Sequence, residues 1–322
     1  MKTTILKINP DNPDKKQISI AAKAIQEAKL VAMPTETVYG LGANALDEKA
    51  VKKIFEAKGR PQDNPLIIHI ADKKDLQKLS REVTQQALTL ANAFWPGPLT
   101  LILKKSDIVP HITTANLDSV AIRMPDNNIA LELIKQANTP IAAPSANISG
   151  KPSPTRAEHV LDDLNNKIDF IIDAEACNIG LESTVIDLTT NTPTILRPGK
   201  ITKEELEQII GPIQEQTTSQ TPKAPGMKYR HYAPEAKIIV VQKEKEITDV
   251  QKKYLQEKIS VLTYTDENSM AKHLFNDLRQ ADKELVDIII VKEVPDKALG
   301  KAIMNRLNKA SDKQPLTKNN LL

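Results

Sequence analysis

The sequence contains a single cysteine, Cys177, among 322 residues. One thiol can form neither an intramolecular disulfide nor a cysteine-based zinc site, and its isolation fits a reducing compartment. Aromatic residues make up only 3% of the chain, which leaves few ring faces on which the bases of single-stranded nucleic acid could stack. A disulfide-stabilised scaffold is therefore excluded, and a stacking RNA-binding protein is disfavoured.

Long apolar runs are also missing. No run approaches the roughly 18 residues that cross a bilayer, and the first residues lack the apolar stretch of a signal peptide. The 44 basic and 41 acidic residues leave a net charge of only +3, so no overall field draws the chain to nucleic acid or an acidic membrane. We expect a cytoplasmic protein without membrane association, in which any recognition of anions is local.

Short β-branched runs alternate with amphipathic helical patterns along the first two thirds of the chain, which is typical of an α/β fold. We expect strands at 4–8, 30–35, 66–70, 99–104, 119–124, 141–146, 169–174, 183–188 and 194–199. The last three runs are too close together for helical crossovers. The pattern therefore predicts a twisted mixed sheet with helices and a concave active-site face.

Capping residues mark two helices of this part of the chain. One should start after Asp47 and end at Gly59, and a second should start at the capping box of Thr202 and Glu205 and end near Gly211. Residues 212–235 are rich in Pro, Thr, Gln and Gly and show no apolar periodicity, so they are expected to be a linker. We therefore assign a first domain to residues 1–211, a linker to 212–235 and a second domain to 236–322.

The second domain has apolar runs at 237–241, 259–264 and 286–291, separated by helical patterns. This alternation predicts a smaller Rossmann-like α/β unit with parallel strands. The unit has no GxGxxG element, so its pattern does not indicate a dinucleotide site.

The segment PTETVYGLGANALD joins a strand to a helix, and Gly40 and Gly42 would let the backbone turn closely while Thr35 and Thr37 offer hydroxyl groups. A polar loop with turn glycines fits equally well. By itself the segment does not identify a ligand.

Two strand residues suggest a pocket. In SVAIRM, alternation places Arg123 on the face opposite Val120 and Ile122. A buried arginine needs an anion, either a protein carboxylate or a ligand. His69 lies on the less apolar face of LIIHI, although a lone strand histidine is more often a core residue than a ligand contact.

Other polar residues have both a structural and a functional interpretation. Lys58 and Arg60 flank Gly59 at a helix end, where basic residues ordinarily complement the helix dipole. The loop from Ser145 to Ser153 could cap and turn the chain, or bind a polyphosphate or ribose. The sequence has no P-loop, and its five histidines lack metal-ligand spacing. These residues indicate an anion pocket and leave its ligand open.

Seven motifs follow one another in the order of a known family: PTETVYGLG, KGRP followed by NPLIIHI, WPGPLTLIL, VAIRMPD, APSANISGKPSPT, ESTVID and ILRPG. In this order they resemble the YrdC family. The later APGMKYRHYAP and the second domain are similar to the long, two-domain form of its threonylcarbamoyl-AMP synthases, apart from Ala224, where serine is common. The resemblance implies a YrdC-like first domain and covers essentially the whole chain.

The resemblance also implies roles for particular residues. The catalytic set would be Lys58, Arg60, Ser145 and Asn147. L-Threonine would lie among Thr37, His69, Arg123, Ala143 and Ser183, with Arg123 meeting its carboxylate. ATP would contact Arg60, Asn64, Ser119, Ser145, Ser153, Arg197 and Tyr232, with Mg²⁺ held mainly through its phosphates and no protein metal site.

The implied activity is that of a nucleotidyltransferase. The amino group of threonine would capture bicarbonate or CO₂, and the carbamate would attack the α-phosphorus of ATP and release pyrophosphate. The threonylcarbamoyl-AMP would pass to a tRNA threonylcarbamoyl-transferase complex. The linker would fold over the pocket as a lid, with Tyr229, His231 or Tyr232 near the nucleotide, or would be a simple tether.

Two alternatives are weighed against this activity. Hydrogenase maturation proteins carry a YrdC-like domain together with zinc-finger cysteines, which a chain with one cysteine cannot supply. A non-catalytic YrdC-like module would instead hold double-stranded RNA through phosphate contacts. The nearly neutral chain makes weak RNA binding the most that we expect from it.

Overall fold

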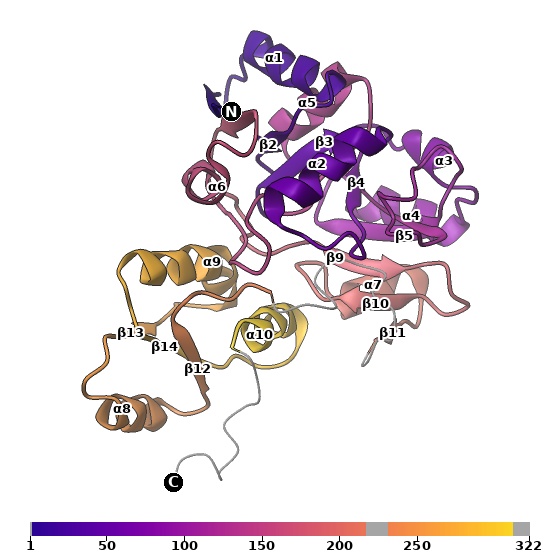
Figure 1. Ribbon diagram of the computed structural model, residues 1–322. Helices are drawn as coiled ribbons and strands as arrows, with labels where there is room; N and C mark the ends of the chain where they lie inside the picture. Colours follow the sequence, from indigo (N-terminus) through magenta and orange to yellow (C-terminus); the bar gives the residue numbers. More distant parts are fainter. Residues whose placement is uncertain (1, 217–230, 312–322) are drawn as a thin grey trace.

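The computed structural model describes residues 2–216 and 231–311. Figure 1 shows a larger α/β body followed by a smaller one. The larger body contains strands β1 (Thr4–Lys7), β2 (Val31–Met33), β3 (Gly40–Asn44), β4 (Ile67–His69), β5 (Leu99–Lys104), β6 (Ser119–Arg123), β7 (Ile141–Ala142), β8 (Phe170–Asp173), β9 (Thr184–Asp187), β10 (Thr194–Arg197) and β11 (Gln214–Glu215). Its helices are α1 (Lys15–Gln26), α2 (Glu48–Lys58), α3 (Asp75–Leu79), α4 (Gln85–Phe94), α5 (Asn128–Ala137), α6 (Ala157–Leu164) and α7 (Lys203–Ile210).

These strands form one sheet in the order β1-β8-β2-β3-β7-β4-β6-β5-β9-β10-β11. Parallel pairs such as β4 with β6 alternate with antiparallel pairs such as β5 with β6 and β9 with β10. The mixed sheet predicted from the closely spaced strands is therefore confirmed. β11 lies inside the predicted linker and pairs with β10; the proposed limits of the linker stay a prediction, and residues 217–230 lie outside the described part.

The two faces of the sheet are covered differently. Ile68 of β4 and Ile122 of β6 pack in a core with residues of α2, α3 and α4. On the opposite face, α1 and α5 cover strands β1, β8, β2 and β7. Further along this second face, His69 pairs in register with Arg123. Within residues 2–216, no helix packs its apolar side on these two residues. The alternation predicted for Arg123 is confirmed, and it turns the arginine toward this half of the face.

The prediction of a turn at Gly40 and Gly42 is wrong. Both glycines lie in β3, which pairs antiparallel with β2 and β7, and neither has a positive φ. A Cβ at Gly42 would lie 2.9 Å from Cγ2 of Ile141, and one at Gly40 would lie 3.1 Å from Cβ of Ala143. The glycines are needed for close packing against the strand that carries the site, and not for a turn.

The predicted helix ends are confirmed. The Asp47 side chain accepts hydrogen bonds from the backbone of Lys49 and Ala50, and α2 ends at Gly59 with φ 60°. Thr202 and Glu205 form the capping box of α7. These caps fix the direction in which the chain leaves each helix, and at Gly59 this brings Arg60 to the pocket described below.

The smaller body consists of β12 (Lys237–Val241), α8 (Glu244–Lys253), β13 (Ile259–Leu262), α9 (Glu267–Lys283), β14 (Ile288–Lys292) and α10 (Ala298–Ala310). Its strands are parallel in the order β12-β14-β13, so the predicted Rossmann-like arrangement is confirmed. α8 packs on one face, and α9 and α10 pack on the other. Among the described residues, no helix is long and apolar enough to cross a membrane.

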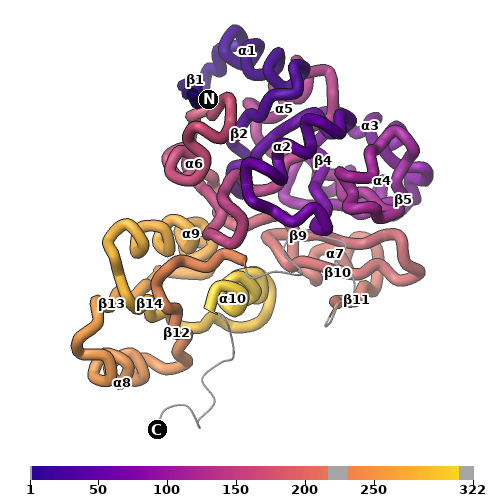
Figure 2. Tube along the Cα trace, in the orientation of Figure 1, coloured from indigo at the N-terminus to yellow at the C-terminus, as the bar shows by residue number. Residues whose placement is uncertain are grey.

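α9 and α10 also pack against the larger body. Val38 and Leu181 of the larger body and Tyr232 belong to the same apolar cluster as α9 and α10. Figure 2 shows these helices beside α6 and β9. The smaller body therefore lies against the half of the sheet that α1 and α5 leave uncovered.

Candidate functional site

A polar pocket lies on this half of the sheet. Its walls come from the segment after β2, the chain after α2, strands β4 and β6, the chain after β7, the end of β10 and the residues that precede β12. It is lined by Thr35, Thr37, Val38, Gly40, Arg60, Ile67, His69, Arg123, Ala143, Pro144, Ser145, Glu182, Arg197, His231 and Tyr232. Three of these residues are arginines that are at least nine-tenths buried.

Arg123 is held by the protein on several sides. Its Nη1 donates to Thr37 Oγ1 at 2.9 Å, and its Nε donates to the Gly97 carbonyl at 3.4 Å. Its Nη2 lies 2.5 Å from Glu36 Oε2 in a buried ion pair, although the two groups lack the alignment of a hydrogen bond. Both interpretations of the strand arginine therefore apply, because Arg123 has a protein carboxylate and also lines a pocket.

Arg60 and Arg197 supply the other two charges. Arg60 Nη2 donates to the carbonyls of Asn64 and Pro65, while its buried Nε has no hydrogen-bond partner within the described part of the protein. Burial lowers the pKa of Arg60 to about 10. Arg197 donates from Nε to the Ser183 carbonyl and from Nη2 to Ser183 Oγ, both at 3.0 Å. Guanidinium groups held in this way are suited to bind phosphate or carboxylate oxygens.

Lys58 has a different position. Its side chain is buried, and Nζ donates to the carbonyl oxygens of Ser145 and Asn147, both at 2.5 Å. Burial, followed by the charge of Arg60, lowers the pKa of Lys58 well below its ordinary value. The ammonium therefore fixes the loop that carries Ser145, and does not itself line the pocket.

A chain of contacts joins Ser153 to the smaller body. Ser153 Oγ donates to Glu182 Oε1 at 2.5 Å, and the other oxygen of Glu182 accepts from Arg306 Nε of α10 at 3.0 Å. Arg279 of α9 donates to the Pro152 carbonyl from both Nε and Nη2. The loop before Ser153 is therefore braced by two arginines of the smaller body.

Two histidines of the pocket, the buried His69 and the partly buried His231, are neutral. Burial, and then the charge of Arg123, lowers the pKa of His69 to about 3; burial, and then Arg60, does the same for His231. The aromatic ring of the neighbouring Tyr232 stacks on Phe275 of α9 with 5.2 Å between ring centroids. A neutral imidazole can donate and accept hydrogen bonds without adding charge.

The pocket brings together nine of the residues proposed from the sequence: Thr37, Arg60, His69, Arg123, Ala143, Ser145, Arg197, His231 and Tyr232. Six others do not line it: Lys58, Asn64, Asn147, Ser119, Ser153 and Ser183. Ser183 and Ser153 instead lie behind the lining residues Arg197 and Glu182 and hydrogen-bond to them. Asn147 donates from Nδ2 to the carbonyls of Ile148 and Lys151 and so holds the loop that follows Ser145. Ser119 starts β6, at the opposite end of the strand from Arg123. Tyr229 lies outside the described residues.

Glu36 and Glu182 are charged partners of the pocket that the sequence motifs did not identify. Glu36 stands between Thr35 and Thr37, and Glu182 precedes β9. The requirement of Arg123 for an anion was the signal for a carboxylate, but it did not tell which one. No group of three histidine, cysteine or acidic side chains in the described part of the chain could hold a metal ion.

Two family models together match most of the chain. The model Sua5_yciO_yrdC, described as "Telomere recombination", matches residues 23–199. The model described as "Threonylcarbamoyl-AMP synthase, C-terminal domain" matches residues 201–312.

Whole-chain relatives give the same result. A threonylcarbamoyl-AMP synthase of Pyrococcus abyssi is 53% identical over 319 residues, covering 92% of this chain and 94% of the relative. One of Bacillus subtilis is 47% identical over 321 residues, covering 92% and 93%. The crystal structure of P. abyssi Sua5 complexed with L-threonine matches with a TM-score of 0.92 and 51% identity, covering 96% of this chain and 98% of that one. The chain therefore belongs to the Sua5–YciO–YrdC family, in the two-domain form that carries the threonylcarbamoyl-AMP synthase C-terminal domain.

Proposed function

We propose that this chain is a threonylcarbamoyl-AMP synthase, a nucleotidyltransferase that makes threonylcarbamoyl-AMP and pyrophosphate from L-threonine, bicarbonate or CO₂, and ATP. The observation that carries the proposal is the convergence of Arg60, Arg123 and Arg197 on one buried pocket. The reaction needs one cation for an amino-acid carboxylate and others for phosphates. The names of the relatives at 53% and 47% identity support the same activity.

Arg123 is suited to the carboxylate of threonine. Thr37 holds one end of its guanidinium, and His69 lies beside it in register. A neutral His69 can hydrogen-bond the hydroxyl or amino group of the substrate without repelling it. In this proposal Ala143 and Ser183 complete the threonine subsite, Ala143 as a small wall of the pocket and Ser183 by holding Arg197.

Arg60 and Arg197 would neutralise the charge that develops on the α-phosphate. Once the amino group has added to CO₂, the carbamate oxygen attacks this phosphorus and the bond to pyrophosphate breaks. Such a reaction depends on positioning and on electrostatic stabilisation, and needs no enzyme nucleophile. The buried Nε of Arg60, which lacks a hydrogen-bond partner among the described residues, supports a role in binding phosphate.

We further propose that Ser145 contacts ATP directly, and that Lys58 and Asn147 keep its loop in place. Asn64, Ser119 and Ser153 would contribute from the rim or from behind the lining residues. Mg²⁺ would enter with ATP as part of the substrate, held through the phosphates. Residues His231 and Tyr232 would close over the nucleotide, and a lid would protect the product from water.

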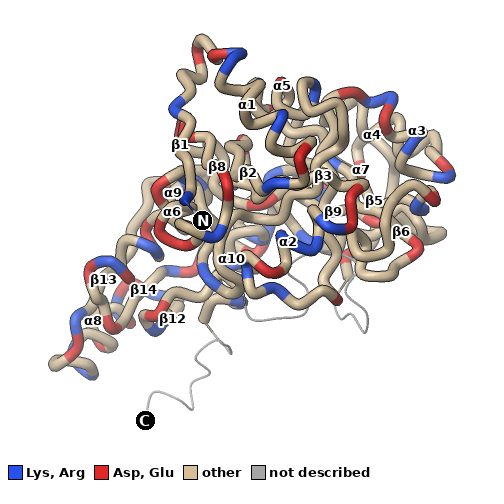
Figure 3. The backbone as a smooth tube through the Cα atoms, turned by 45° about the horizontal axis from the view of Figure 1, so that its top comes forward, with Lys and Arg blue, Asp and Glu red and all other residues tan. Residues whose placement is uncertain are grey.

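The product is a mixed anhydride that water hydrolyses, so it must be consumed by an acyl transfer. We propose transfer to a tRNA threonylcarbamoyl-transferase complex in the cytoplasm, where ATP and tRNA occur together. The double-stranded RNA module is not favoured. Lys and Arg are interspersed with Asp and Glu along the described backbone (Figure 3), and the whole chain carries a net charge of only +3, which does not favour binding through phosphate contacts.

The direct test is pyrophosphate release from ATP and Mg²⁺, with L-threonine and bicarbonate added singly and together. The proposal expects release only when both are present, and expects it to be lost in Arg60→Ala. Release without threonine, or none under any combination while RNA binds with a steep salt dependence, would reject it.

A further inference from the structure

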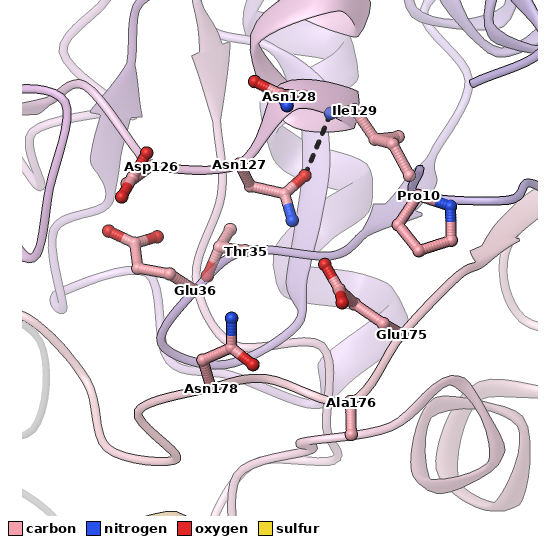
Figure 4. Close-up of a pocket in the computed structure, with 10 residues that line it drawn as sticks. All are labelled: Pro10, Thr35, Glu36, Asp126, Asn127, Asn128, Ile129, Glu175, Ala176 and Asn178. Atoms are coloured by element: carbon pink, nitrogen blue, oxygen red, sulfur yellow. Dashed lines mark hydrogen bonds between the residues drawn. The ribbon is translucent and has the colours of Figure 1, made fainter. Parts of the chain in front are cut away.

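A second cavity is lined by Glu36, the ion-pair partner of Arg123. It has a volume of about 120 Å³ and is lined by Pro10, Thr35, Glu36, Asp126, Asn127, Asn128, Ile129, Glu175, Ala176 and Asn178. Figure 4 shows Glu36 and Asp126 facing one another at its edge. Thr35 lines both this cavity and the arginine pocket. The Glu36 carboxylate is therefore the connection between the cavity and Arg123.

Glu36 is more than nine-tenths buried, and its Oε1 has no hydrogen-bond partner among the described residues. Its other oxygen lies 2.5 Å from Arg123 Nη2. A buried carboxylate without hydrogen bonds from the protein is retained at a cost in desolvation. What the protein gains in return is a counter-charge on the arginine that would bind the substrate.

We propose that Glu36 is an internal counter-ion of Arg123 that lowers the affinity of the site for the carboxylate of the amino-acid substrate. The inference rests on the proposed function, because it takes Arg123 as the group that binds this carboxylate. Glu36 and the substrate carboxylate then share one guanidinium. Glu36 thereby determines how tightly the site holds carboxylate ligands.

Glu36 lowers the affinity for the substrate carboxylate because the two groups carry the same charge. At an effective dielectric constant of about 20, two carboxylates about 6 Å apart weaken each other's binding by roughly two powers of ten. Relaxation of the side chains reduces this effect, so we expect about a tenfold gain in affinity when the Glu36 charge is removed. An orienting role would have the opposite sign, because Arg123 would lose a support.

The cavity gives the Glu36 carboxylate room to move away from Arg123. Asn127 uses its side-chain oxygen to cap α5 through the backbone of Ile129 and Ala130, which leaves its amide nitrogen as a donor beside the cavity. The N-terminus of α5 also favours negative charge at this place. Burial, and then the charge of Glu36, raises the pKa of Asp126, which indicates that the two carboxyl groups interact across the cavity.

The test is calorimetric binding of L-threonine and of L-threoninol, which lacks the carboxylate, to the full chain and its variants. Glu36→Gln keeps the size of the side chain and removes its charge. Glu175→Gln is the matched control, since it makes the same change at an exposed residue of the same cavity. We expect Glu36→Gln to bind L-threonine about tenfold more tightly than the wild type, with L-threoninol unchanged, and Glu175→Gln to bind both as the wild type does.

Equal or weaker threonine binding by Glu36→Gln, or the same change for threoninol, would overturn the inference and leave the proposed function in place. Failure of the wild type to bind threonine would overturn both. If Glu36→Gln does not fold, Glu36→Asp tests the inference instead. Its shorter side chain keeps the charge but places the carboxylate farther from Arg123. It should gain affinity for threonine by a smaller factor, and an unchanged or weaker affinity would count against the counter-ion.

Discussion

Arg306 of α10 donates from Nε to Glu182 Oε2 at 3.0 Å, and its side chain is completely buried. Glu182 lines the arginine pocket and accepts a hydrogen bond from Ser153. A residue of the smaller body thus holds a carboxylate at the edge of the site from behind. The sequence left the role of this body open, and the contact makes it part of the support of the pocket.

Removing one partner of this pair should destabilise the protein strongly. Arg306→Met leaves the Glu182 carboxylate buried without its main counter-charge and removes a donor to the Pro198 carbonyl, so we expect a loss of about 3–5 kcal/mol in the free energy of unfolding. Urea unfolding measures this loss. Glu182→Gln in the same chain should recover part of it.

The matched control is Arg81→Met, which makes the same change at an exposed arginine that pairs with Asp118. It should lower the free energy of unfolding by less than about 1 kcal/mol. Equal losses of unfolding free energy in the two variants would show that the buried ion pair of Arg306 stabilises the protein no more than an exposed one.

Gly180 of the larger body lies in close contact with α9 of the smaller body, so a substitution there probes how the two bodies pack. It has φ +79°, and a Cβ there would lie 2.4 Å from the Ala271 carbonyl oxygen of α9. Gly211 also has φ +79°, but no atom lies within 4 Å of its Cβ position. Gly211→Ala should therefore show only backbone strain, of about 1 kcal/mol.

Gly180→Ala should show this strain together with displacement of α9. We expect it to be less stable than Gly211→Ala by at least about 1–2 kcal/mol and to lose activity, as measured by urea unfolding and by pyrophosphate release. The same stability for both alanine variants would mean that the two bodies are not held at this contact.

Stability should fall as the pH drops below 6.5. Burial lowers the pKa of His69, His159 and His231 to about 3. The folded protein therefore keeps these imidazoles neutral, while the unfolded chain takes up protons below its pKa of about 6.5. The contribution of these neutral histidines to the free energy of unfolding is fully present above pH 6.5 and is lost progressively as the pH falls toward 3.

Between pH 7 and 5.5 each of these histidines should remove about 1 kcal/mol from the free energy of unfolding. Urea unfolding at the two pH values measures the sum. His159→Gln, which keeps an acceptor for the backbone of Thr155, should reduce this pH dependence by about one third. A slope that does not change in the variant would show that His159 is protonated in the folded protein.

Lys58 should act through its loop. Lys58→Met loses two hydrogen bonds to the carbonyls of Ser145 and Asn147 but removes a charge that burial disfavours, so the free energy of unfolding should change by less than about 2 kcal/mol. Catalytic efficiency with ATP should fall at least about tenfold, because Ser145 is no longer held. Hydrogen exchange of residues 145–151 should rise at the same time.

Lys52→Met is the control, since Lys52 lies on the same helix with an exposed side chain. It should leave both the exchange and the activity unchanged. Activity that falls in Lys58→Met without faster exchange of the loop would indicate a direct contact between Lys58 and the nucleotide.

Local features of the fold could be predicted from the sequence because they depend on neighbouring residues. The caps at Asp47 and Thr202 and the αL end at Gly59 follow from rules of helix termini. The position of Arg123 follows from alternation along one strand. The same reasoning misassigned Gly40 and Gly42, because glycine serves both turns and close strand packing and only the neighbouring strand decides between them.

Partners that are distant in the sequence could not be predicted in this way. Arg306 and Glu182 are 124 residues apart, and nothing in either neighbourhood identifies the other. Glu36 stands beside the predicted Thr37, but a carboxylate in a polar segment does not reveal which arginine it meets. The resemblance supplied most of the residues that line the pocket and some that hold them from behind, such as Lys58 and Ser183. The carboxylates Glu36 and Glu182 and the contact from Arg306 appear only in the fold.

The most direct test of the central claim is to follow ¹³C-labelled bicarbonate in a reaction with ATP, Mg²⁺ and L-threonine by mass spectrometry. We expect a product with the mass of threonylcarbamoyl-AMP that carries one labelled carbon, requires all three substrates and is absent in Arg60→Ala. Release of AMP or pyrophosphate without a labelled product of this mass would contradict the account.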